Sequence, residues 1–511
     1  MPKRSTANSA TIPPPVNGWN TRDPISGMDP LYAIDTSNFI AKGGGVELRK
    51  GCQRHTKYSG GGTATDIIPI LASVQNPDGT AVLVCTDAGG LTFYDATTAG
   101  NMIVFDAGSP YSGTSAVTPF TFNGNLIFAG QDGTPEYFLM RLDTTSPPGG
   151  IITAITPSPV ITFPIVCAGS YKNILYLTDS EFPNLVKYGG FQNQNWGTTR
   201  TFDFNFILKK GGKTIFIGTL ARSEQISDQY FMLCTDEGEI LIYSGLDPSS
   251  PTWTIIGHYF IPPPTGTHAF VPYGSDMLIL TMRGVVSMSD IMQNGQEINF
   301  MSDNINDQFS EVMLITAATS YYAMGCWWPE MGWIIFNIPI DDTTGAPNCI
   351  QFVYETSTRS WWKFEGLKAF YWCVHEGELY FASTHNKIFK ITGYYDEDPA
   401  NEGAILTRTI KLRPAYNYFG DRSASKQFVE ARPILKQSEG LTLTMDADVD
   451  YQDTTATNTV TDLTNTAYKL YAPRVGLQGI GRCASIRIDG TVTTKRFRLE
   501  ATEVIWNDGD I

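Results

Sequence analysis

Two short stretches of the chain carry residue types that are found in enzyme active sites. The sequence GGKT at residues 211–214 matches the end of a nucleotide-binding P-loop, and SASK at residues 423–426 has the Ser-x-x-Lys spacing of a serine nucleophile with a lysine beside it. The first glycine of a P-loop would fall at Ile207, and no helical pattern follows. The SDN sequence at residues 302–304 precedes the Ser-x-x-Lys stretch instead of following it, and a Lys-Thr-Gly element is missing. Neither stretch therefore predicts a catalytic site.

Four aspartates stand close together at Asp446, Asp448, Asp450 and Asp453. Alternate aspartates on one face of a strand could gather around calcium, although an EF-hand loop would need glycine at Tyr451 and glutamate at Thr457. The other interpretation is the solvated face of a strand. Both interpretations stay open at this point.

Sugar chemistry is the remaining catalytic possibility. Sialidase-type propellers have Ser-x-Asp-x-Gly-x-x-Trp turns, and the nearest match, which runs from Ser244 to Trp253, lacks the glycine. Tryptophans 327, 328, 333, 361, 362 and 372 could stack on sugars, but aromatic side chains this large more often wedge between sheets. No nucleophile elbow, histidine pair with ligand spacing or Cys–His set is present. We expect no catalytic residue, no cofactor and no metal, with a glycan-binding or glycan-hydrolysing β-propeller as the alternative.

The cysteines predict free thiols. Eight of them are spread along the chain without a C-x-x-C pair, several lie within apolar runs, and five histidines are available to join them. Buried free thiols fit this pattern better than zinc or disulfides. The N-terminus lacks the apolar core of a secretion signal, and no run of about 18 apolar residues could span a bilayer. We expect a protein made in a cytoplasm without stable insertion into a membrane.

The charge of the chain excludes tight binding to nucleic acid. The formal net charge is −15, from 51 acidic and 36 basic side chains. Proteins that wrap a phosphate backbone need clustered Lys and Arg, whereas an acidic wall repels DNA and keeps it mobile. Charged residues make up only 17% of the chain, against about 25% in an average protein. A sparsely charged chain is often a subunit that buries much of its surface in an assembly, although some large β proteins also have few charged residues.

Repeated hairpins indicate how the chain is organised. Between residues 228 and 289, two copies of one pattern follow each other, each an apolar strand, a turn with Gly238 or Gly284, and a second apolar strand. Related patterns surround the turns at residues 87–90, 123–125 and 376–378. A period of roughly 40–50 residues in all-β sequence is typical of a β-propeller. The prediction is an all-β protein with a propeller of six or seven blades over residues 61–395.

Residues outside this repeat form a second predicted domain. Residues 1–15 are polar and end in proline, which predicts a flexible N-terminal arm. Residues 396–511 contain longer strands with alternating polarity, notably 441–445 and 484–488, which predict a β-sandwich-like platform domain. We expect residues 16–60 to pack with that C-terminal domain.

Several segments, taken in order, resemble one protein family. They are NGWNTRDP at residues 17–24, MDP at 28–30, VELRKG at 46–51, TDEGE at 235–239, YSGLDP at 243–248, GSDM at 274–277, RGVVSMS at 283–289, and KQF at 426–428 with RP at 432–433. This pattern resembles the tail hub or nozzle proteins of short-tailed bacteriophages, also called tail tubular protein B. The resemblance implies a structural virion protein of the tail, made in the host bacterial cytoplasm, and not an enzyme. It implies a homo-hexamer that docks on the tail adaptor ring, with tail fibres or tailspikes as further candidate partners. DNA would pass through the channel of this hexamer without specific binding.

Three basic residues are our candidates for the adaptor interface. Arg422, Lys426 and Arg432 stand close together in a subunit that is otherwise acidic, so they could pair with carboxylates on a neighbour. The alternative is that they solvate the surface or pin a local turn. A general cellular scaffold propeller is a third possible class for the whole chain.

Overall fold

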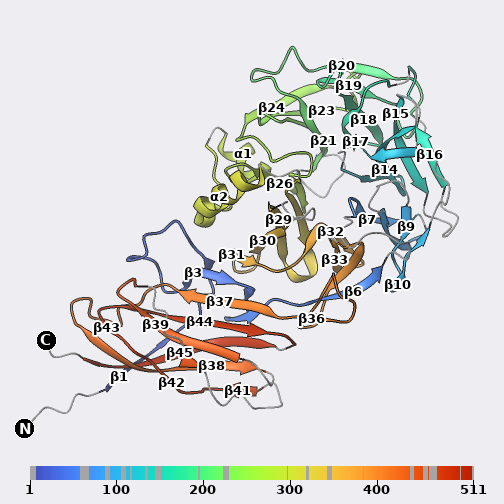
Figure 1. The fold of residues 1–511 in the computed structure, drawn as a ribbon. Coiled ribbons are helices and arrows are strands. Elements are labelled where there is room, and N and C mark those ends of the chain that lie inside the picture. Colours follow the sequence, from blue (N-terminus) through green and yellow to red (C-terminus); the bar gives the residue numbers. More distant parts are fainter. Residues whose placement is uncertain are drawn as a thin grey trace, which may run out of the picture.

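The computed structural model describes most of the chain. The described residues are 7–57, 68–76, 78–86, 93–104, 111–114, 118–132, 136–143, 151–155, 157–159, 161–193, 196–221, 229–295, 297–317, 321–341, 348–383, 385–437, 442–452, 458–459, 469–494 and 496–508. Within them the fold is nearly all β, which confirms the all-β part of the prediction (Figure 1). Of the helices in these residues, none is long and apolar enough to cross a bilayer.

Seven antiparallel sheets follow one another along the chain in the described residues. Five are separate sheets, and two are parts of larger sheets. In chain order the sheets contain β7 (Leu71–Gln75), β8 (Ala81–Thr86), β9 (Phe93–Asp95) and β11 (Ile103–Val104); β12 (Tyr111–Thr114), β13 (Phe120–Phe122), β14 (Asn125–Asp132), β15 (Glu136–Asp143) and β16 (Ile151–Ile155); β17 (Ile165–Tyr171), β18 (Ile174–Asp179), β19 (Leu185–Tyr188) and β20 (Arg200–Asp203); β21 (Thr214–Ala221), β22 (Gln229–Thr235), β23 (Glu239–Ser244) and β24 (Thr254–Phe260); β25 (Phe270–Tyr273), β26 (Asp276–Thr281) and β27 (Gly284–Ser287); β28 (Met324–Trp328), β29 (Trp333–Asp341), β30 (Asn348–Glu355) and β31 (Ser360–Phe364); and β32 (Ala369–His375), β33 (Glu378–Ser383) and β34 (Lys387–Ile391). The helices α1 (Met288–Asn294) and α2 (Asn306–Thr316) lie between the fifth and sixth sheets, and the short helix η2 (Asp303–Ile305) precedes α2.

Each of these sheets contacts the next one along the chain, and the last sheet contacts the first. Strand β14 contacts β7 and β17, β17 contacts β21, β21 contacts β26, β25 contacts β28, β28 contacts β32, and β32 contacts β7. The seven sheets therefore surround a common centre, as Figure 1 shows. We call this unit the sheet ring.

Tight turns explain the hairpins of the ring. Gly238 and Gly284 have φ values of 77° and 153°, and they lie in the turns between β22 and β23 and between β26 and β27. Asn123 and Gly124, with φ of 48° and 77°, occupy the turn between β13 and β14. Glycine and asparagine adopt positive φ more readily than other residues, which is why these hairpins were predictable. The predicted turn at residues 87–90 lies outside the described residues.

The second unit consists of two sheets with a shared core. One contains β1 (Ala7–Ile12), β4 (Phe39–Lys42), β5 (Gly45–Leu48), β38 (Lys426–Gln437), β41 (Lys469–Tyr471), β42 (Val475–Gly476), β43 (Ile480–Gly481) and β45 (Phe497–Asp508). The other contains β2 (Gly18–Trp19), β3 (Tyr32–Ser37), β37 (Arg408–Pro414), β39 (Thr442–Val449), β40 (Asn458–Thr459) and β44 (Ala484–Val492). Buried residues of both sheets, among them Phe428, Leu443 and Ile488, belong to one hydrophobic cluster. Residues 442–445 pair with β44 and β40 and take no part in the sheet ring.

Hydrogen bonding continues from the ring into this second unit. Strand β31 pairs with β2, so one ten-stranded sheet runs from β28 through β31, β2 and β3 to β40. The last ring sheet likewise continues from β34 to β6 (Cys52–Lys57), which also pairs with β10 (Gly100–Asn101) and with β35 (Asp396–Glu397), and β35 pairs with β36 (Ile405–Leu406). The two units are thus joined by paired strands as well as by the connecting chain.

Two sequence expectations need correction. Residues 16–60 do not pack only with the C-terminal region, because β6 pairs along β34 of the ring and gives that strand a partner on its second edge. The predicted flexible arm is wrong for residues 7–12, because β1 pairs with β45 from Ala7↔Asn507 to Ile12↔Thr502. Strand β5 pairs with β45 only at Arg498 and Leu499. The rest of that edge would expose unpaired backbone groups if β1 did not cover it.

Candidate functional site and interaction surfaces

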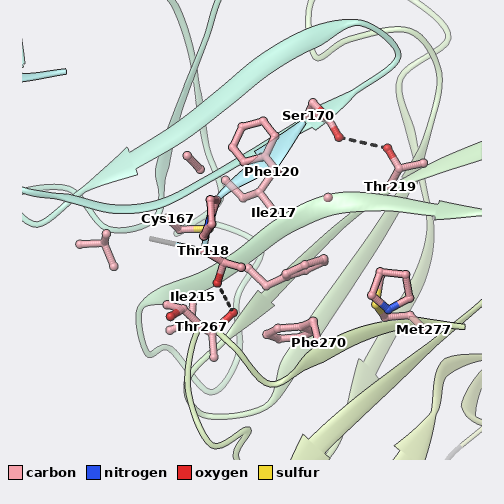
Figure 2. A pocket seen from close by; sticks show the side chains of 17 residues that line it. Thr118, Phe120, Cys167, Ser170, Ile215, Ile217, Thr219, Thr267, Phe270 and Met277 are labelled. Carbon is pink, nitrogen blue, oxygen red and sulfur yellow. Dashed lines mark hydrogen bonds between the residues drawn. The ribbon is translucent and has the colours of Figure 1, made fainter. Parts of the chain in front are cut away.

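Two cavities open near the centre of the sheet ring. The first has a volume of about 370 Å³ and lies between β17, β21 and β25 (Figure 2). Its walls are mainly apolar, with Phe120, Ile217 and Phe270 among the lining residues. Two hydrogen bonds tie neighbouring segments together here, from Thr118 Oγ1 to the carbonyl of Thr267 and from Thr219 Oγ1 to the carbonyl of Ser170, each 3.0 Å long. The second cavity, of about 450 Å³, is lined by residues of β7, β13, β25, β28 and β32.

Neither cavity has the groups that acid–base catalysis needs. Among the described residues that line them there is no Asp, Glu, Lys or Arg. Burial lowers the pKa of His268 to about 3, and its ring stacks on Tyr322 with 3.7 Å between ring centroids. Burial raises the pKa of Cys373 to about 12. Both groups are therefore uncharged at neutral pH, whereas glycoside hydrolysis normally requires a pair of carboxyl groups.

The tryptophans act as core residues. Trp328, Trp333, Trp361, Trp362 and Trp372 are all buried. Trp362 belongs to the cluster that connects ring and second unit, and its Nε1 donates to Ser360 Oγ at 2.7 Å. These five residues are core residues, as the wedge interpretation expects, whereas Trp327 is only partly buried and lines the second cavity. The eight cysteines are all free thiols, as the sequence predicted, and six of them are buried.

The solvated-face interpretation is wrong for Asp446 and Asp448, which are buried, whereas Asp450 is exposed. Asp448 is fully buried and forms ion pairs with Arg413 (2.8 Å) and Arg487 (3.3 Å). Asp446 is 2% exposed, and the Oδ1 atom of Asp450 accepts the amide of Arg482 at 2.8 Å. Asp453 lies outside the described residues. Across the described residues, no group of three or more His, Cys, Asp or Glu side chains could hold a metal ion.

The three adaptor-interface candidates have separate local partners. Lys426 is 2% exposed, and its Nζ donates to the carbonyls of Asp421 (2.5 Å), Ala424 (3.1 Å) and Arg482 (3.4 Å). The structure therefore corrects its role, because a buried ammonium group that pins a turn cannot reach a partner. Arg432 pairs with Glu430 (2.5 Å) and Glu503 (3.6 Å) on its own sheet, and Arg422 lies 4.5 Å from the ring centroid of Tyr418. Arg422 and Arg432 keep part of their surface open to solvent.

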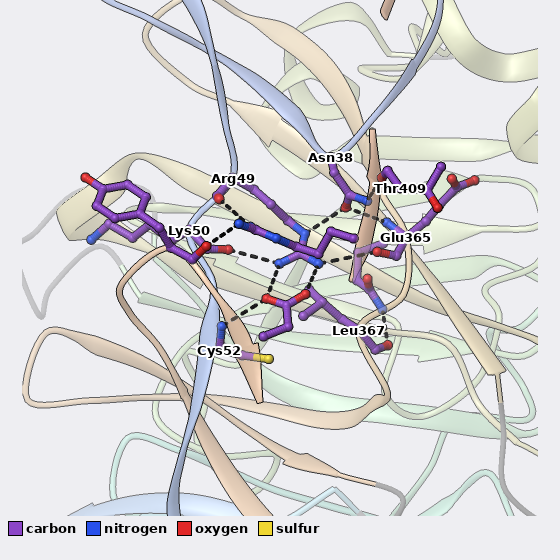
Figure 3. A network of polar contacts seen from close by, with 11 residues as sticks. Asn38, Arg49, Lys50, Cys52, Glu365, Leu367 and Thr409 are labelled. Atoms are coloured by element: carbon purple, nitrogen blue, oxygen red, sulfur yellow. Dashed lines mark hydrogen bonds and ion pairs between the residues drawn. The ribbon is translucent and has the colours of Figure 1, made fainter. Parts of the chain in front are cut away.

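A buried polar network joins the two units (Figure 3). Arg49 is 1% exposed, and its guanidinium donates to both carboxylate oxygens of Asp396, at 3.0 and 2.6 Å. Its Nε donates to Asn38 Oδ1 at 2.7 Å, and Asn38 in turn donates to the carbonyl of Thr409 at 2.8 Å. Asp396 also accepts the amide of Cys52 at 3.2 Å. The network thus connects Cys52 of β6 and Asp396 of β35 with Thr409 of β37.

Arg408 adds a second buried guanidinium to this network. It is 4% exposed and donates to the carbonyl of Arg49 at 3.1 Å and to the carbonyl of Tyr394. Burial, followed by the neighbouring charge of Arg49, lowers the pKa of Arg408 to about 10. Sequence reasoning missed the network. No local pattern marks Arg49, Asp396 and Arg408 as partners, because 347 residues separate the first two.

The comparisons with known proteins leave the function open. No family model matches the chain, and no curated protein matches it. Among solved structures, the chain is similar to Sqt1 of Saccharomyces cerevisiae (TM-score 0.41, 11% identity, 71% of this chain and 96% of that chain) and to the computationally designed protein Ika8 (TM-score 0.38, 9% identity, 66% and 99%). It also matches Raptor of Chaetomium thermophilum with a TM-score of 0.32 and 8% identity, over 68% of this chain and 26% of that protein. Likenesses this weak do not identify what the chain does.

Proposed function

We propose that this chain is a subunit of the tail nozzle of a short-tailed bacteriophage, with a seven-bladed β-propeller and a β-sandwich platform. The observation that carries the proposal is the ring of seven sheets around an uncharged apolar centre, fastened by shared sheets to a domain built from both chain ends. The described residues that line this centre include no Asp, Glu, Lys or Arg. The segments that resemble nozzle proteins are the reason why we propose a phage tail nozzle as the assembly.

Under this proposal DNA passes between subunits and not through one propeller. The two central cavities have volumes of only about 370 and 450 Å³. A DNA double helix needs far more room, since an α-helix of about 10–12 Å diameter already fits inside its major groove. A channel for DNA therefore requires several copies around a common axis. The net charge of −15 makes such a wall repel the phosphate backbone.

Imaging of the purified protein tests the proposal. Negative-stain electron microscopy should show rings with sixfold symmetry and a central opening wide enough for DNA. The reason is that a nozzle subunit places much of its contact energy in contacts with identical copies. Particles that remain single at all concentrations, together with binding or hydrolysis of host-surface glycans, would instead support the glycan-active propeller.

We further propose that Arg422 and Arg432 contribute to the contact with the adaptor ring. Replacing both with Ala should leave the fold intact and yield particles that package DNA and then leak it, because the nozzle does not attach. Lys426 must stay unchanged in this variant, because its buried ammonium group holds three backbone carbonyls. The control is Arg283→Ala, an exposed arginine in the turn between β26 and β27 of the ring. Stable, infectious particles carrying the double arginine variant would exclude this interface.

A further inference from the structure

In the part of the chain that the structure describes, the exposed phenylalanines lie at the ends of one sheet. The chain contains 28 phenylalanines, and in the described residues the exposed ones are Phe163, Phe182, Phe191 and Phe206. Their exposed fractions are 37, 48, 56 and 90%. All four lie in β17–β20 or in the segments directly before, between and after these strands. A soluble protein rarely leaves a group of large apolar side chains in water without a partner.

Three of the four lie at the same end of that sheet. The register pairs Ile165 with Asp179 and Leu185 with Asp203, so the start of β17, the turn after β18 and the end of β20 meet. The amide of Ser180 donates to the carbonyl of Pro164 at 2.9 Å, and the amide of Phe204 donates to the carbonyl of Asn184 at 3.1 Å. Neighbouring strands are about 4.8 Å apart, so four strand ends span roughly 15 Å. Phe163, Phe182 and Phe206 therefore lie at one end of the sheet, which we call the phenylalanine end, while Phe191 follows β19 at the opposite end.

Side-chain hydrogen bonds hold the loops of the phenylalanine end in place. Asp179 Oδ1 accepts the amide of Phe182 at 3.0 Å, and Asp203 Oδ1 accepts the amide of Asn205 at 2.8 Å. The buried carboxylate of Glu239 accepts the amides of Lys209 and Lys210, each at 2.7 Å. Loops that are already ordered lose little conformational entropy when they bind. The three aromatic side chains are thus presented on a prepared surface.

We propose that the phenylalanine end is a docking surface for a second copy of this chain, and this inference rests on the ring assembly proposed above. An aromatic side chain can bury about 150–250 Å². Phe163, Phe182 and Phe206 are 37, 48 and 90% exposed, so the area they still have to bury is roughly 260–440 Å², a third to a half of the roughly 800 Å² that one partner contributes to a stable interface. In Figure 1 this sheet lies at the far side of the ring from β38 and β45, so the second unit of the same chain does not cover it.

Charge distinguishes a protein partner from a lipid surface. Lys209, Lys210 and Lys213 are exposed near the phenylalanine end, together with the exposed carboxylates of Glu181 and Glu237 and the partly buried Asp203 and Asp236. Segments that bind membranes combine apolar side chains with an excess of basic ones. Here the acidic groups offset the lysines. An apolar centre with a rim of both signs is typical of contacts between proteins.

The test compares a variant changed at the phenylalanine end with a control changed at the opposite end of the sheet, and adds one single substitution. Phe163→Ser, Phe182→Ser and Phe206→Ser combined should weaken self-association at least about tenfold in sedimentation velocity over a range of concentrations, because buried aromatic anchors dominate binding energy. Phe191→Ser, a residue of the same type on the same sheet with 56% exposure, should associate like the unmodified protein. Phe206→Ser alone, at a side chain that is 90% exposed, keeps the fold intact and should show part of the loss.

Each result bears on a different proposal. If the unmodified protein and the triple variant form the same rings, the docking surface is excluded while the nozzle proposal stands. If the unmodified protein does not associate at all, the ring assembly proposal fails, and the docking inference fails with it. If the triple variant loses binding to phosphatidylcholine vesicles but not self-association, the phenylalanine end serves a membrane and our assignment is wrong.

Discussion

Asp396→Asn should lower the free energy of unfolding by about 3–5 kcal/mol, the cost typical of removing one partner from a buried ion pair. The reason is the position of Asp396 between two buried guanidinium groups. Arg49 donates to both oxygens of its carboxylate, and Arg408 lies close enough for its charge to act on the pKa of Asp396. The amide side chain has the same shape but no charge, so both arginines would stay buried without a counter-ion. Urea unfolding followed by tryptophan fluorescence measures the loss.

A surface ion pair close to this network serves as the control. Glu402 pairs with Arg54 and Lys57 of β6 at a site where its side chain is 49% exposed. Glu402→Gln should change the stability little, because water replaces an exposed partner. Equal losses for Asp396→Asn and Glu402→Gln would show that the buried pair does not hold the two units together.

The same network predicts a dependence on pH. Burial acts to raise the pKa of Asp396, but the charge and hydrogen bonds of Arg49 and the charge of Arg408 outweigh burial, so the pKa lies below its ordinary value. A carboxylate with a lowered folded-state pKa stabilises the protein fully above its unfolded-state pKa of about 3.9. This contribution is lost as the pH falls through the folded-state pKa. The difference in stability between the unmodified protein and Asp396→Asn should therefore be constant near neutral pH and shrink below about pH 4.

Local signals made part of this fold predictable. The turns at Gly238 and Gly284 need positive φ, and the alternation of apolar and polar residues in β39 and β44 indicated strands. These features depend on residues that are neighbours in the chain.

Long-range pairing accounts for what sequence reasoning missed. Strand β6 pairs with β34, and β1 pairs with β45, across more than 300 and nearly 500 residues, and the choice of partner depends on which sheet edge remains free. Lys426 looked like a surface residue because its neighbours are Ser, Ala and Gln, yet three carbonyls from two segments surround its Nζ. The phenylalanine end was equally hidden. Nothing in the sequence distinguishes Phe206, which is exposed, from Phe204, which is buried.

Asp448→Asn should also cost about 3–5 kcal/mol, because it removes the charge from a fully buried carboxylate that two arginines share. Arg413 and Arg487 come from β37 and β44, the two strands that pair with each other next to β39. Losing the shared carboxylate would leave their guanidinium groups to repel one another at the centre of one sheet. Urea unfolding measures this loss as well.

Asp446→Asn, two residues away on the same strand, is the matched control. Burial raises the pKa of Asp446, and Asn can still accept the amide of Ala447 that Asp446 Oδ1 accepts at 2.8 Å. This variant should therefore lose much less stability than Asp448→Asn. The pair also decides between an ion-pair site and a calcium site. Because two guanidinium groups already balance Asp448 and would repel a divalent cation, neither calcium nor a chelator should shift the melting temperature in calorimetry. A melting temperature that rises by several degrees with calcium and falls in Asp446→Asn would show that the row binds the metal.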